Sequence, residues 1–444
     1  MAWLLRAFRT VYRLSQWTRR RFTVAGMALV YLLSASAVFG VDTQRTAAFQ
    51  LFALALALLA VAALTNARFR PRVALERRLP EFATVGEPFR YRQLVHNRGP
   101  KRLAGIRLRD ELAEHFPDAD TFRSARDAAG NETVTWVDRR VGYPRWLELV
   151  RRGRGAEIQD AAVPDVPPGG TAEVAVAVTP VRRGLLRFER CRLLRADVLG
   201  LVNACIQVEL AGELLVLPRC YPVPPMRLPG MRRLQRGGVA LSHNVGDSQE
   251  FTQLRDYRPG DPLRHVHWPS FAKVGALVVK EYHDEYFTRH ALVLDTFARA
   301  VDAPALEAAV SVAASFVAAM QMHDALLDLV FVEDRAYRLT VGRGLGRGTD
   351  LLRELAAIGP ARSQGFEPLA AQVLEHAAAL SGCILVLLDF DDARRKLVRA
   401  LRAVGVRQLV IVIGEPREAE LDVPIYPIDR DDVGGSLARL PQVW

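Results

Sequence analysis

The chain has 444 residues, a formal net charge of +11, and hydrophobic residues at half of its positions. This length fits two or three domains, and the composition excludes a disordered or collagen-like chain. Nearly all basic residues are Arg, which we attribute to coding bias rather than to phosphate binding. The four cysteines lack C-x-x-C spacing, which argues against a zinc finger or a disulfide framework and fits a reducing compartment; they are Cys191, Cys205, Cys220 and Cys383.

Two apolar stretches near the N-terminus indicate a membrane anchor. Residues 22–41 and 46–64 contain no charged residue, and each is long enough to cross the hydrocarbon core. The loop between them is so short that we expect a two-helix transmembrane hairpin over residues 22–65. We interpret residues 1–21 as a basic amphipathic segment that lies along the membrane surface.

Arginines predict the orientation of this hairpin. The loop contains only Arg45, whereas arginines flank both spans: Arg6, Arg9, Arg13, Arg19, Arg20 and Arg21 before them, and Arg68, Arg70, Arg72, Arg77 and Arg78 after them. Positive flanks stay in the cytoplasm, so we expect a multi-pass protein of the bacterial inner membrane with both termini cytoplasmic. A cleaved signal peptide ending near Ala35-Ser36-Ala37 is the alternative.

Residues 73–222 show short β-rich runs separated by turn signals. The stretch at 89–99 alternates apolar and polar residues, and the runs over 171–202 are broken at Pro180 and Gly184. Such spacing is typical of an antiparallel β-sandwich, which here would serve as a spacer or docking module. We interpret the irregular stretch at 117–154 as an elaborated loop that could carry a hairpin.

Residues 290–444 alternate buried strands with amphipathic helices. Strands are expected at HALVLDT, ALLDLVFV, AYRLTV, CILVLLDF and QLVIVIG, and helices at 303–323, 349–358 and 366–380. This order predicts a mostly parallel, doubly wound α/β domain. Ligands of such sheets bind at the carboxyl ends of strands, where Asp295 and Asp389 fall.

Between these domains, residues 223–289 contain a basic linker and the charged stretch FTQLRDYRPGDPLRHVHW (251–268). Three interpretations fit its residues. Asp256 or Asp261 could act as a general base with His265 as an acid, or His265 and His267 could bind zinc with His243 or His283. Alternatively, the stretch forms an ionic clamp between the two flanking domains, with Arg255, Asp256, Asp261 and Arg264 paired.

This stretch resembles the signature of the Domain of Unknown Function 58 family. The matching residues are Arg255, Asp256, Tyr257, Pro259, Gly260, Asp261, Arg264 and Trp268, followed by Lys273 and Lys280. The resemblance implies two N-terminal spans, a β-sandwich and a C-terminal von Willebrand factor A-like domain. It also implies a MoxR-type AAA+ ATPase as partner, often with a transglutaminase-like protein, and no established reaction.

Von Willebrand A-like domains often bind Mg²⁺ through Asp-x-Ser-x-Ser, a Thr and a second Asp. Asp295, Thr349 and Asp389 match three of these positions, but Phe297 and Arg299 replace the two serines. Mg²⁺ requires hard oxygen ligands, so we expect no metal and an ion pair between Arg299 and Asp295 instead.

The sequence therefore predicts a non-enzymatic, membrane-anchored adaptor that does not bind nucleic acid. Two alternatives remain open. One is a metal-dependent enzyme that uses His265, His267, Asp261 and the strand-end aspartates. The other is an envelope structural protein that associates with itself.

Overall fold

The computed structural model describes residues 2–39, 47–67, 69–128, 142–225, 251–259, 263, 266–282, 289–298, 303–320, 326–332, 336–341, 348–361, 365–415 and 424–441. The chain divides into two compact units. The first comprises Met1–Tyr221, Ala298–Ser315 and Thr349–Pro360. The second comprises Pro222–Phe297, Phe316–Gly348 and Ala361–Trp444.

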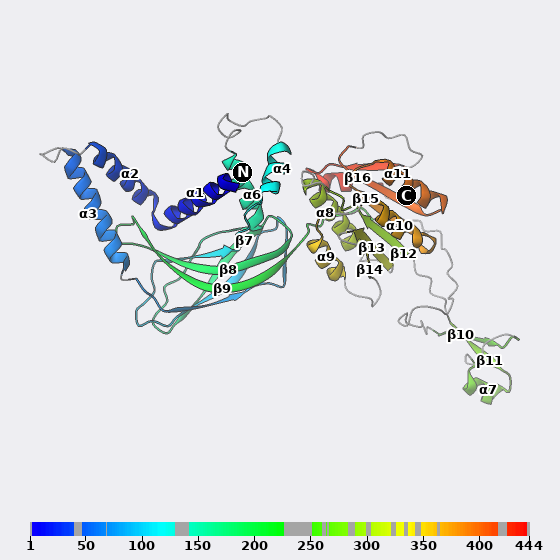
Figure 1. Ribbon diagram of the computed structural model, residues 1–444. Helices are drawn as coiled ribbons and strands as arrows, with labels where there is room; N and C mark the ends of the chain where they lie inside the picture. The colour runs from blue at the N-terminus through cyan, green and yellow to red at the C-terminus, as the bar shows by residue number, and fades with distance from the viewer. Residues whose placement is uncertain are drawn as a thin grey trace. The chain divides into compact units, whose positions relative to one another are not determined.

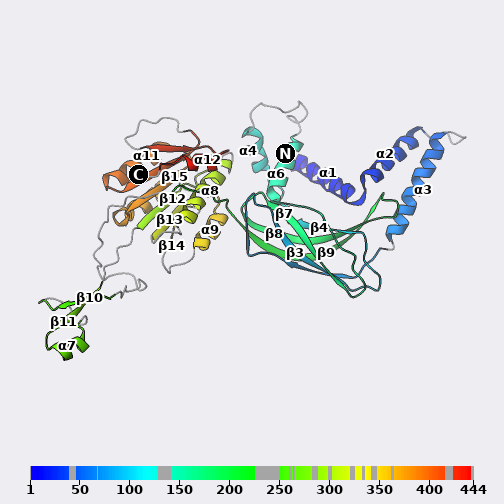
Figure 2. The same ribbon diagram turned by 180° about the vertical axis from the view of Figure 1, so that it is seen from behind.

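The first unit begins with three helices: α1 (Ala2–Arg21), α2 (Val24–Phe39) and α3 (Ala47–Ala67). Helices α2 and α3 lie side by side in both views (Figures 1 and 2). Among the described residues, α3 is the helix that is long and apolar enough to cross a membrane, whereas α2 is apolar but shorter. The expected hairpin is thus supported at one span, and the second span stays a prediction.

Helix α1 carries apolar residues on two faces. Leu5, Phe8 and Tyr12 are buried in an aromatic cluster with Trp146 and its neighbours. The other face exposes Trp3, Leu14 and Trp17, each more than half accessible. The predicted amphipathic helix is therefore present, but protein rather than lipid covers one of its apolar faces.

Two sheets follow, as the period-two pattern predicted. The order in the four-stranded sheet is β1 (Val73–Arg78), β3 (Phe89–Asn97), β7 (Thr171–Pro180), β5 (Ala156–Ile158), and every pairing is antiparallel. The order in the five-stranded sheet is β2 (Phe82–Thr84), β9 (Asn203–Leu217), β8 (Gly184–Ala196), β4 (Ile106–Leu112), β6 (Ala161–Ala162). Only the β2–β9 pairing in this sheet is parallel.

Both sheets contribute to one hydrophobic core. Tyr91 and Val176 from the first sheet pack with Leu108, Phe188 and Val216 from the second. One ion pair is buried beside this core, because Arg77 donates to both oxygens of Asp110, at 3.0 and 2.7 Å. The Tyr91 hydroxyl donates to the same carboxylate, and burial first, then the charge of Asp110, raises the pKa of Tyr91. This buried carboxylate is therefore satisfied by its own neighbours.

The region expected as an elaborated loop at 117–154 is largely helical, so that prediction is wrong. It contains α4 (Ala119–Ala128) and α6 (Tyr143–Arg154). Trp146 and Val150 lie one turn apart on α6 and are both buried, which fixes this helix against α1. The positive φ of Gly142 and Gly155 marks the two ends of α6.

The second unit is built on a six-stranded mixed sheet (Figure 1). Its order is β14 (Ala336–Val341), β13 (Leu326–Val332), β12 (Arg289–Leu294), β15 (Gly382–Leu387), β16 (Arg407–Ile413), β17 (Ile425–Ile428). All pairings are parallel except β13–β14. The five strands expected from the sequence are confirmed, and β17 is an additional one.

The helices of this half of the chain follow the expected order. Helix α8 (Ala303–Met320) and α9 (Gly348–Ala357) match the first two predictions closely. The third predicted helix divides into α10 (Glu367–Glu375) and a 3₁₀ turn at Ala377–Ala379. Helices α11 (Asp392–Ala403) and α12 (Val433–Ala438) complete the α/β pattern. Apolar residues of α10 and α11 pack on buried residues of β12, β15 and β16 in one core.

Candidate functional site

The signature residues fold into a small module within the second unit. Strand β10 (Phe251–Asp256) pairs antiparallel with β11 (Val278–Tyr282), so that Arg255 lies opposite Val279. Helix α7 (Trp268–Val274) lies between these strands in sequence. Val266 forms a bridge with Val279, and both side chains are buried. These two valines form the centre of the module.

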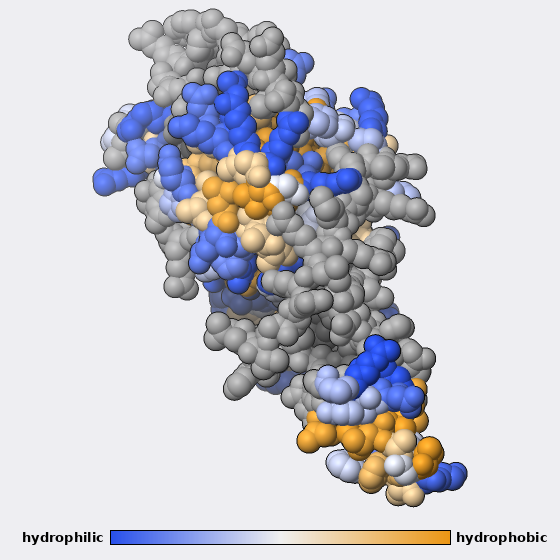
Figure 3. Space-filling view, turned by 90° about the vertical axis from the view of Figure 1, so that its right-hand side faces the viewer, coloured by the Kyte–Doolittle hydropathy of each residue, from blue (hydrophilic) through white to orange (hydrophobic). Residues whose placement is uncertain are grey.

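The surface of the module is mainly hydrophobic. Trp268, Phe271 and Val274 are 58%, 38% and 69% exposed, and Leu254 and Leu263 are also exposed. The rings of Trp268 and Phe271 meet edge to face with centroids 6.0 Å apart. The lowest part of Figure 3 shows hydrophobic side chains gathered on one face. We call Leu254, Leu263, Trp268, Phe271 and Val274 the module surface.

Helix geometry explains why these residues lie together. Pro269 starts α7, and Gly275 ends it in the left-handed region at φ 71°. Residues three apart on such a helix share a face, so Trp268, Phe271 and Val274 point the same way. Alternation along an extended backbone predicts Trp268 on the same face as Arg264 and Val266. That prediction is wrong, because Pro269 favours the first turn of a helix and Trp268 begins α7.

The remaining signature residues are partly described. The backbone N–H of Tyr257 donates to the Leu277 carbonyl at 2.9 Å, which extends the hairpin by one bond. Arg255 is partly buried and Asp256 is exposed, as the strand alternation predicted. Pro259 and Lys273 are exposed, and Lys280 is partly buried. Gly260, Asp261 and Arg264 lie outside the described residues, so the ionic clamp stays a prediction.

The histidines of the signature do not form a zinc site within the described chain. Nδ1 of His267 is 2.7 Å from Ser270 Oγ, in the first turn of α7. His265, His243 and His283 lie outside the described residues. No group of three potential metal ligands forms among the residues that the structure describes.

The carboxyl end of β12 places Asp295 in a closed polar network. The Asp295 side chain is fully buried, and its Oδ1 accepts a hydrogen bond from the Phe297 N–H at 3.0 Å. Its Oδ2 accepts from the Leu388 N–H at 3.0 Å and from Nε of Arg394 at 2.7 Å. Arg394 is therefore a partner of Asp295, and Arg299, the partner expected from the sequence, lies outside the described residues.

Arg394 is held in place by two further groups. Its Nη1 donates to Asp391 at 2.6 Å, and its guanidinium lies 4.7 Å from the centroid of the Phe366 ring. Burial lowers the pKa of Arg394, but the nearby carboxylates of Asp295 and Asp391 outweigh burial and raise it. The guanidinium thus stays charged and neutralises the buried aspartate.

This arrangement does not fit the Mg²⁺ site that the resemblance implied. Both oxygens of Asp295 are engaged by protein donors, and a guanidinium stands where a cation would bind. Asp389 Oδ1 accepts from the N–H of Phe390 at 2.7 Å. Thr349 belongs to α9. The residues are suited to a structural ion pair rather than to metal binding.

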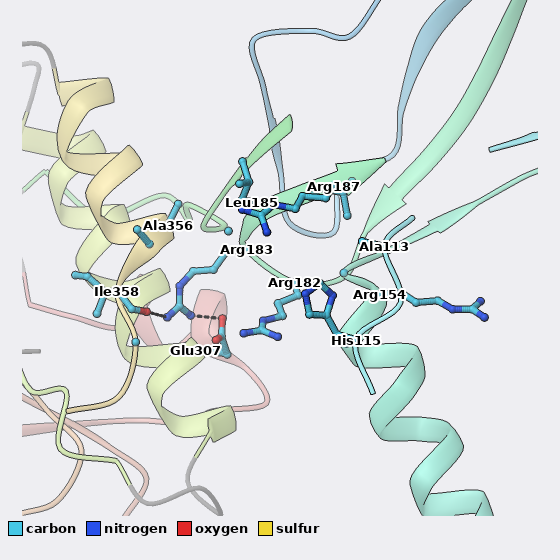
Figure 4. Close-up of a pocket in the computed structure, with 16 residues that line it drawn as sticks. Ala113, His115, Arg154, Arg182, Arg183, Leu185, Arg187, Glu307, Ala356 and Ile358 are labelled. Carbon is cyan, nitrogen blue, oxygen red and sulfur yellow. Dashed lines mark hydrogen bonds and ion pairs between the residues drawn. The ribbon is translucent and has the colours of Figure 1, made fainter. Parts of the chain in front are cut away.

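The first unit contains a pocket of about 450 Å³ that sequence reasoning missed (Figure 4). Arg183, just before Gly184 at the start of β8, donates to the Ile358 carbonyl at 2.7 Å and the Leu355 carbonyl at 3.2 Å. It also pairs with Glu307, and burial lowers its pKa despite that carboxylate. The sequence does contain a signal for this arginine, because it lies in the turn Arg182-Arg183-Gly184. We interpreted that turn only as a break between strands.

Because Arg183 already has an anionic partner and two carbonyl acceptors, it cannot serve as an open anion-binding group. His115, Arg154 and Arg182 also line this pocket (Figure 4). We therefore interpret Arg183 as structural, a buried cation that ties the start of β8 to residues 298–315 and 349–360 of the same unit.

Comparison with known proteins places these residues in context. Residues 253–429 match the model of a family described as "Protein of unknown function DUF58". A curated relative, "Uncharacterized protein YeaD" of Bacillus subtilis (strain 168), is 24% identical over 284 residues, which cover 63% of this chain and 67% of YeaD.

Solved structures give weak matches. The CARDB domain of PF1109 from Pyrococcus furiosus is 12% identical, with 33% of this chain and 94% of that domain covered and a TM-score of 0.17. A PapD-like domain of human CEP192 is 10% identical, with 32% and 85% covered and a TM-score of 0.17. These scores are too low to indicate a shared architecture.

The family match begins inside β10 and ends just after β17, so it includes both the module surface and the six-stranded sheet. It contains every described signature residue from Arg255 to Lys280. The resemblance drawn from those residues is confirmed by the match of residues 253–429 to the DUF58 family model.

Proposed function

We propose that this chain is a membrane-anchored adaptor that faces the cytoplasm. It presents its signature module and C-terminal α/β domain to a MoxR-type AAA+ ATPase, which remodels or matures a client protein. In this proposal the α/β domain is von Willebrand A-like, the two sheets form a β-sandwich spacer, and α2 and α3 both span the inner membrane.

The exposed module surface is the observation that carries this proposal. An isolated hairpin and short helix would gain stability by burying Trp268 and Phe271, yet both remain accessible. Covering a side chain of this size stabilises a complex by roughly 1.5–3 kcal/mol, and Trp is enriched among residues that dominate binding. An exposed apolar patch that includes the signature residue Trp268 is suited to recognition of another protein.

Other features support the anchor and the orientation. Helix α3 has the length and composition of a span, and Arg70 and Arg72 follow it. The mixed sheet with β14 antiparallel at one edge is compatible with a von Willebrand A-like domain. The closed Asp295–Arg394 pair favours a binding role over the metal-dependent enzyme that we considered as an alternative.

Crosslinking in native membranes tests the proposal. Tagged full-length protein is crosslinked, solubilised and purified, and captured proteins are identified by mass spectrometry. We expect a MoxR-type ATPase with the natural chain, and at least a fivefold loss of it with a Trp268→Ala, Phe271→Ala double variant. Val404→Ala removes an exposed apolar side chain from the C-cap of α11 and serves as the matched control.

Two outcomes would contradict the proposal. If no AAA+ ATPase is captured by the natural chain, the partner assignment is wrong. If the chain crosslinks mainly to itself and forms a stable oligomer without an ATPase, the self-associating structural alternative replaces it.

A further inference from the structure

A second cavity in the first unit has a volume of about 570 Å³ and is rich in arginine. Its lining comes from α1, from the outer face of β4 and β8, and from the end of α6. The arginines that line it are Arg13, Arg20, Arg109, Arg154, Arg190 and Arg192. We call this space the α1 cavity.

The positive charge of the α1 cavity is only partly neutralised. Glu111 pairs with Arg20 at 2.9 Å and with Arg192 at 2.8 Å. The other ion pairs are Asp160 with Arg109 at 2.5 Å, Glu114 with Arg154 at 3.7 Å, and Glu189 with Arg190 at 2.9 Å. The six lining arginines are therefore paired with four carboxylates, and Asp110, which also lines the cavity, is paired with Arg77, so a surplus of positive charge remains.

Strand register brings like charges together in this cavity. Arg109 on β4 lies directly opposite Arg192 on β8. Like charges at opposed positions of a ladder destabilise a sheet. Burial lowers the pKa of Arg20, and the nearby guanidinium groups of Arg192 and Arg109 lower it further. The carboxylate of Glu111 raises this pKa but does not outweigh the other effects. An anion in the cavity would relieve this repulsion.

Unsatisfied donors point to the same kind of ligand. The Nε groups of Arg190 and Arg192 are buried and have no hydrogen-bond partner in the part of the chain that the structure describes. A buried donor without an acceptor costs about 1–3 kcal/mol. Phosphate oxygens are strong acceptors for guanidinium groups, and they form short charge-assisted hydrogen bonds with them.

The position of the cavity along the chain indicates where such a phosphate comes from. Arg20 lies at the end of α1, four residues before α2 begins. This junction is fixed to the β8–β9 turn, because Thr23 Oγ1 donates to the Gly200 carbonyl at 2.6 Å and Asn203 Nδ2 to the Arg20 carbonyl at 3.3 Å. Trp3, Leu14 and Trp17 form an exposed apolar face on the same helix, of a kind that lies at a lipid interface.

We propose that the α1 cavity binds the phosphate group of an anionic phospholipid. The arginines of α1, β4 and β8 hold the headgroup, and the acyl chains extend toward α2 and α3. Bound lipid would thereby fix the orientation of the two sheets against the membrane surface. This inference rests on the membrane anchor of the proposed function and is independent of the ATPase assignment.

Binding of short-chain lipids to the full-length protein in neutral detergent tests the proposal. Dihexanoyl phosphatidylglycerol is the anionic probe, dihexanoyl phosphatidylcholine the zwitterionic one, and inorganic phosphate the soluble one. We expect phosphatidylglycerol to bind roughly tenfold more tightly than phosphatidylcholine. Arg192→Gln and Arg190→Gln should each weaken phosphatidylglycerol binding roughly tenfold.

Arg107→Gln is the matched control. Arg107 lies two residues from Arg109 on β4, but its side chain is exposed and does not line the cavity. Its loss should weaken binding less than about twofold, because salt screens exposed charges. Arg190→Gln keeps the test decisive if Arg192→Gln, which removes one of the two arginines paired with Glu111, does not fold.

Three results would overturn the proposal. Equal affinity for the two lipids would exclude anion recognition. An equal effect of Arg107→Gln and Arg190→Gln would indicate a general surface charge rather than a site. Inorganic phosphate that binds as tightly as phosphatidylglycerol would assign the cavity to a soluble phosphate compound instead of a lipid.

Discussion

The carboxyl end of β12 and the module surface belong to the same DUF58 match, yet their side chains are used in opposite ways. At β12, Asp295 is fully buried and every partner it needs comes from the same sheet region and α11. Among the described residues of the module, only Val266 and Val279 are buried, and Trp268 and Phe271 are accessible. The polar groups at β12 are satisfied within the domain, whereas the side chains of the module surface remain exposed to solvent.

This difference separates what stabilises the domain from what is available for binding. Replacing a residue in the closed network should change the free energy of unfolding. Replacing a residue of the module surface should change binding and leave folding intact. Four predictions test that separation, from the largest expected effect on stability to the smallest.

Arg394→Met leaves the buried carboxylate of Asp295 without its cation. We expect the free energy of unfolding to fall by about 3–5 kcal/mol, measured by chemical denaturation of the full-length protein. Arg399→Met removes an exposed charge from the same helix and should cost less than about 0.5 kcal/mol. Similar effects of the two variants would mean that the Asp295 network is not closed.

His290 makes the same sheet sensitive to acid. Burial lowers its pKa to about 4, below the ordinary value of 6.5, so the folded state keeps this side chain neutral. Its contribution to stability is complete above pH 6.5 and is lost as the pH falls toward 4, by up to roughly 3 kcal/mol. His290→Gln should flatten the unfolding free energy over that interval, and an unchanged pH profile would refute this role.

Thr340→Val tests a polar group at the other end of the sheet. Its hydroxyl donates to Asp328 at 2.6 Å, and that buried carboxylate also accepts two hydrogen bonds from Arg289. Loss of one hydrogen bond to a charged group should cost about 1.5–3 kcal/mol, measured by thermal unfolding. A neutral result would show that Arg289 alone satisfies Asp328.

Trp268→Ala should change the unfolding free energy by less than about 0.5 kcal/mol, because more than half of this side chain is already in solvent. Capture of the ATPase in crosslinked membranes should nevertheless decrease several-fold. A large loss of stability would show that Trp268 stabilises the module itself. The module surface would then not differ from the Asp295 network in its role.

The sequence predicted the parts of this fold that depend on local pattern. Continuous apolar strands such as residues 382–387 and 407–413 are recognisable because both faces of the sheet are covered. Helix α3 was evident from its length and lack of charge. Helix α6 was missed because its basic last turn and flanking glycines resemble a loop.

Long-range partners were not predictable in the same way. Arg394 lies 99 positions from Asp295, and nothing in the sequence distinguishes it from the nearer Arg299. The arginines of the α1 cavity are spread over two helices and two strands, so they were interpreted as coding bias. The module surface was missed because Trp268 and Phe271 face the same way only once α7 is known to be helical.

The short connection from β15 to α11 limits the insertions that this domain can accept. Asp391 caps α11 through the N–H of Arg394 and also binds its guanidinium, while the N–H of Leu388 reaches Asp295. One extra residue at the start of α11 would rotate the positions after it by about 100° and carry Arg394 off its partner. Length variation between Leu388 and Arg394 should therefore be rare, whatever residues occupy the connection.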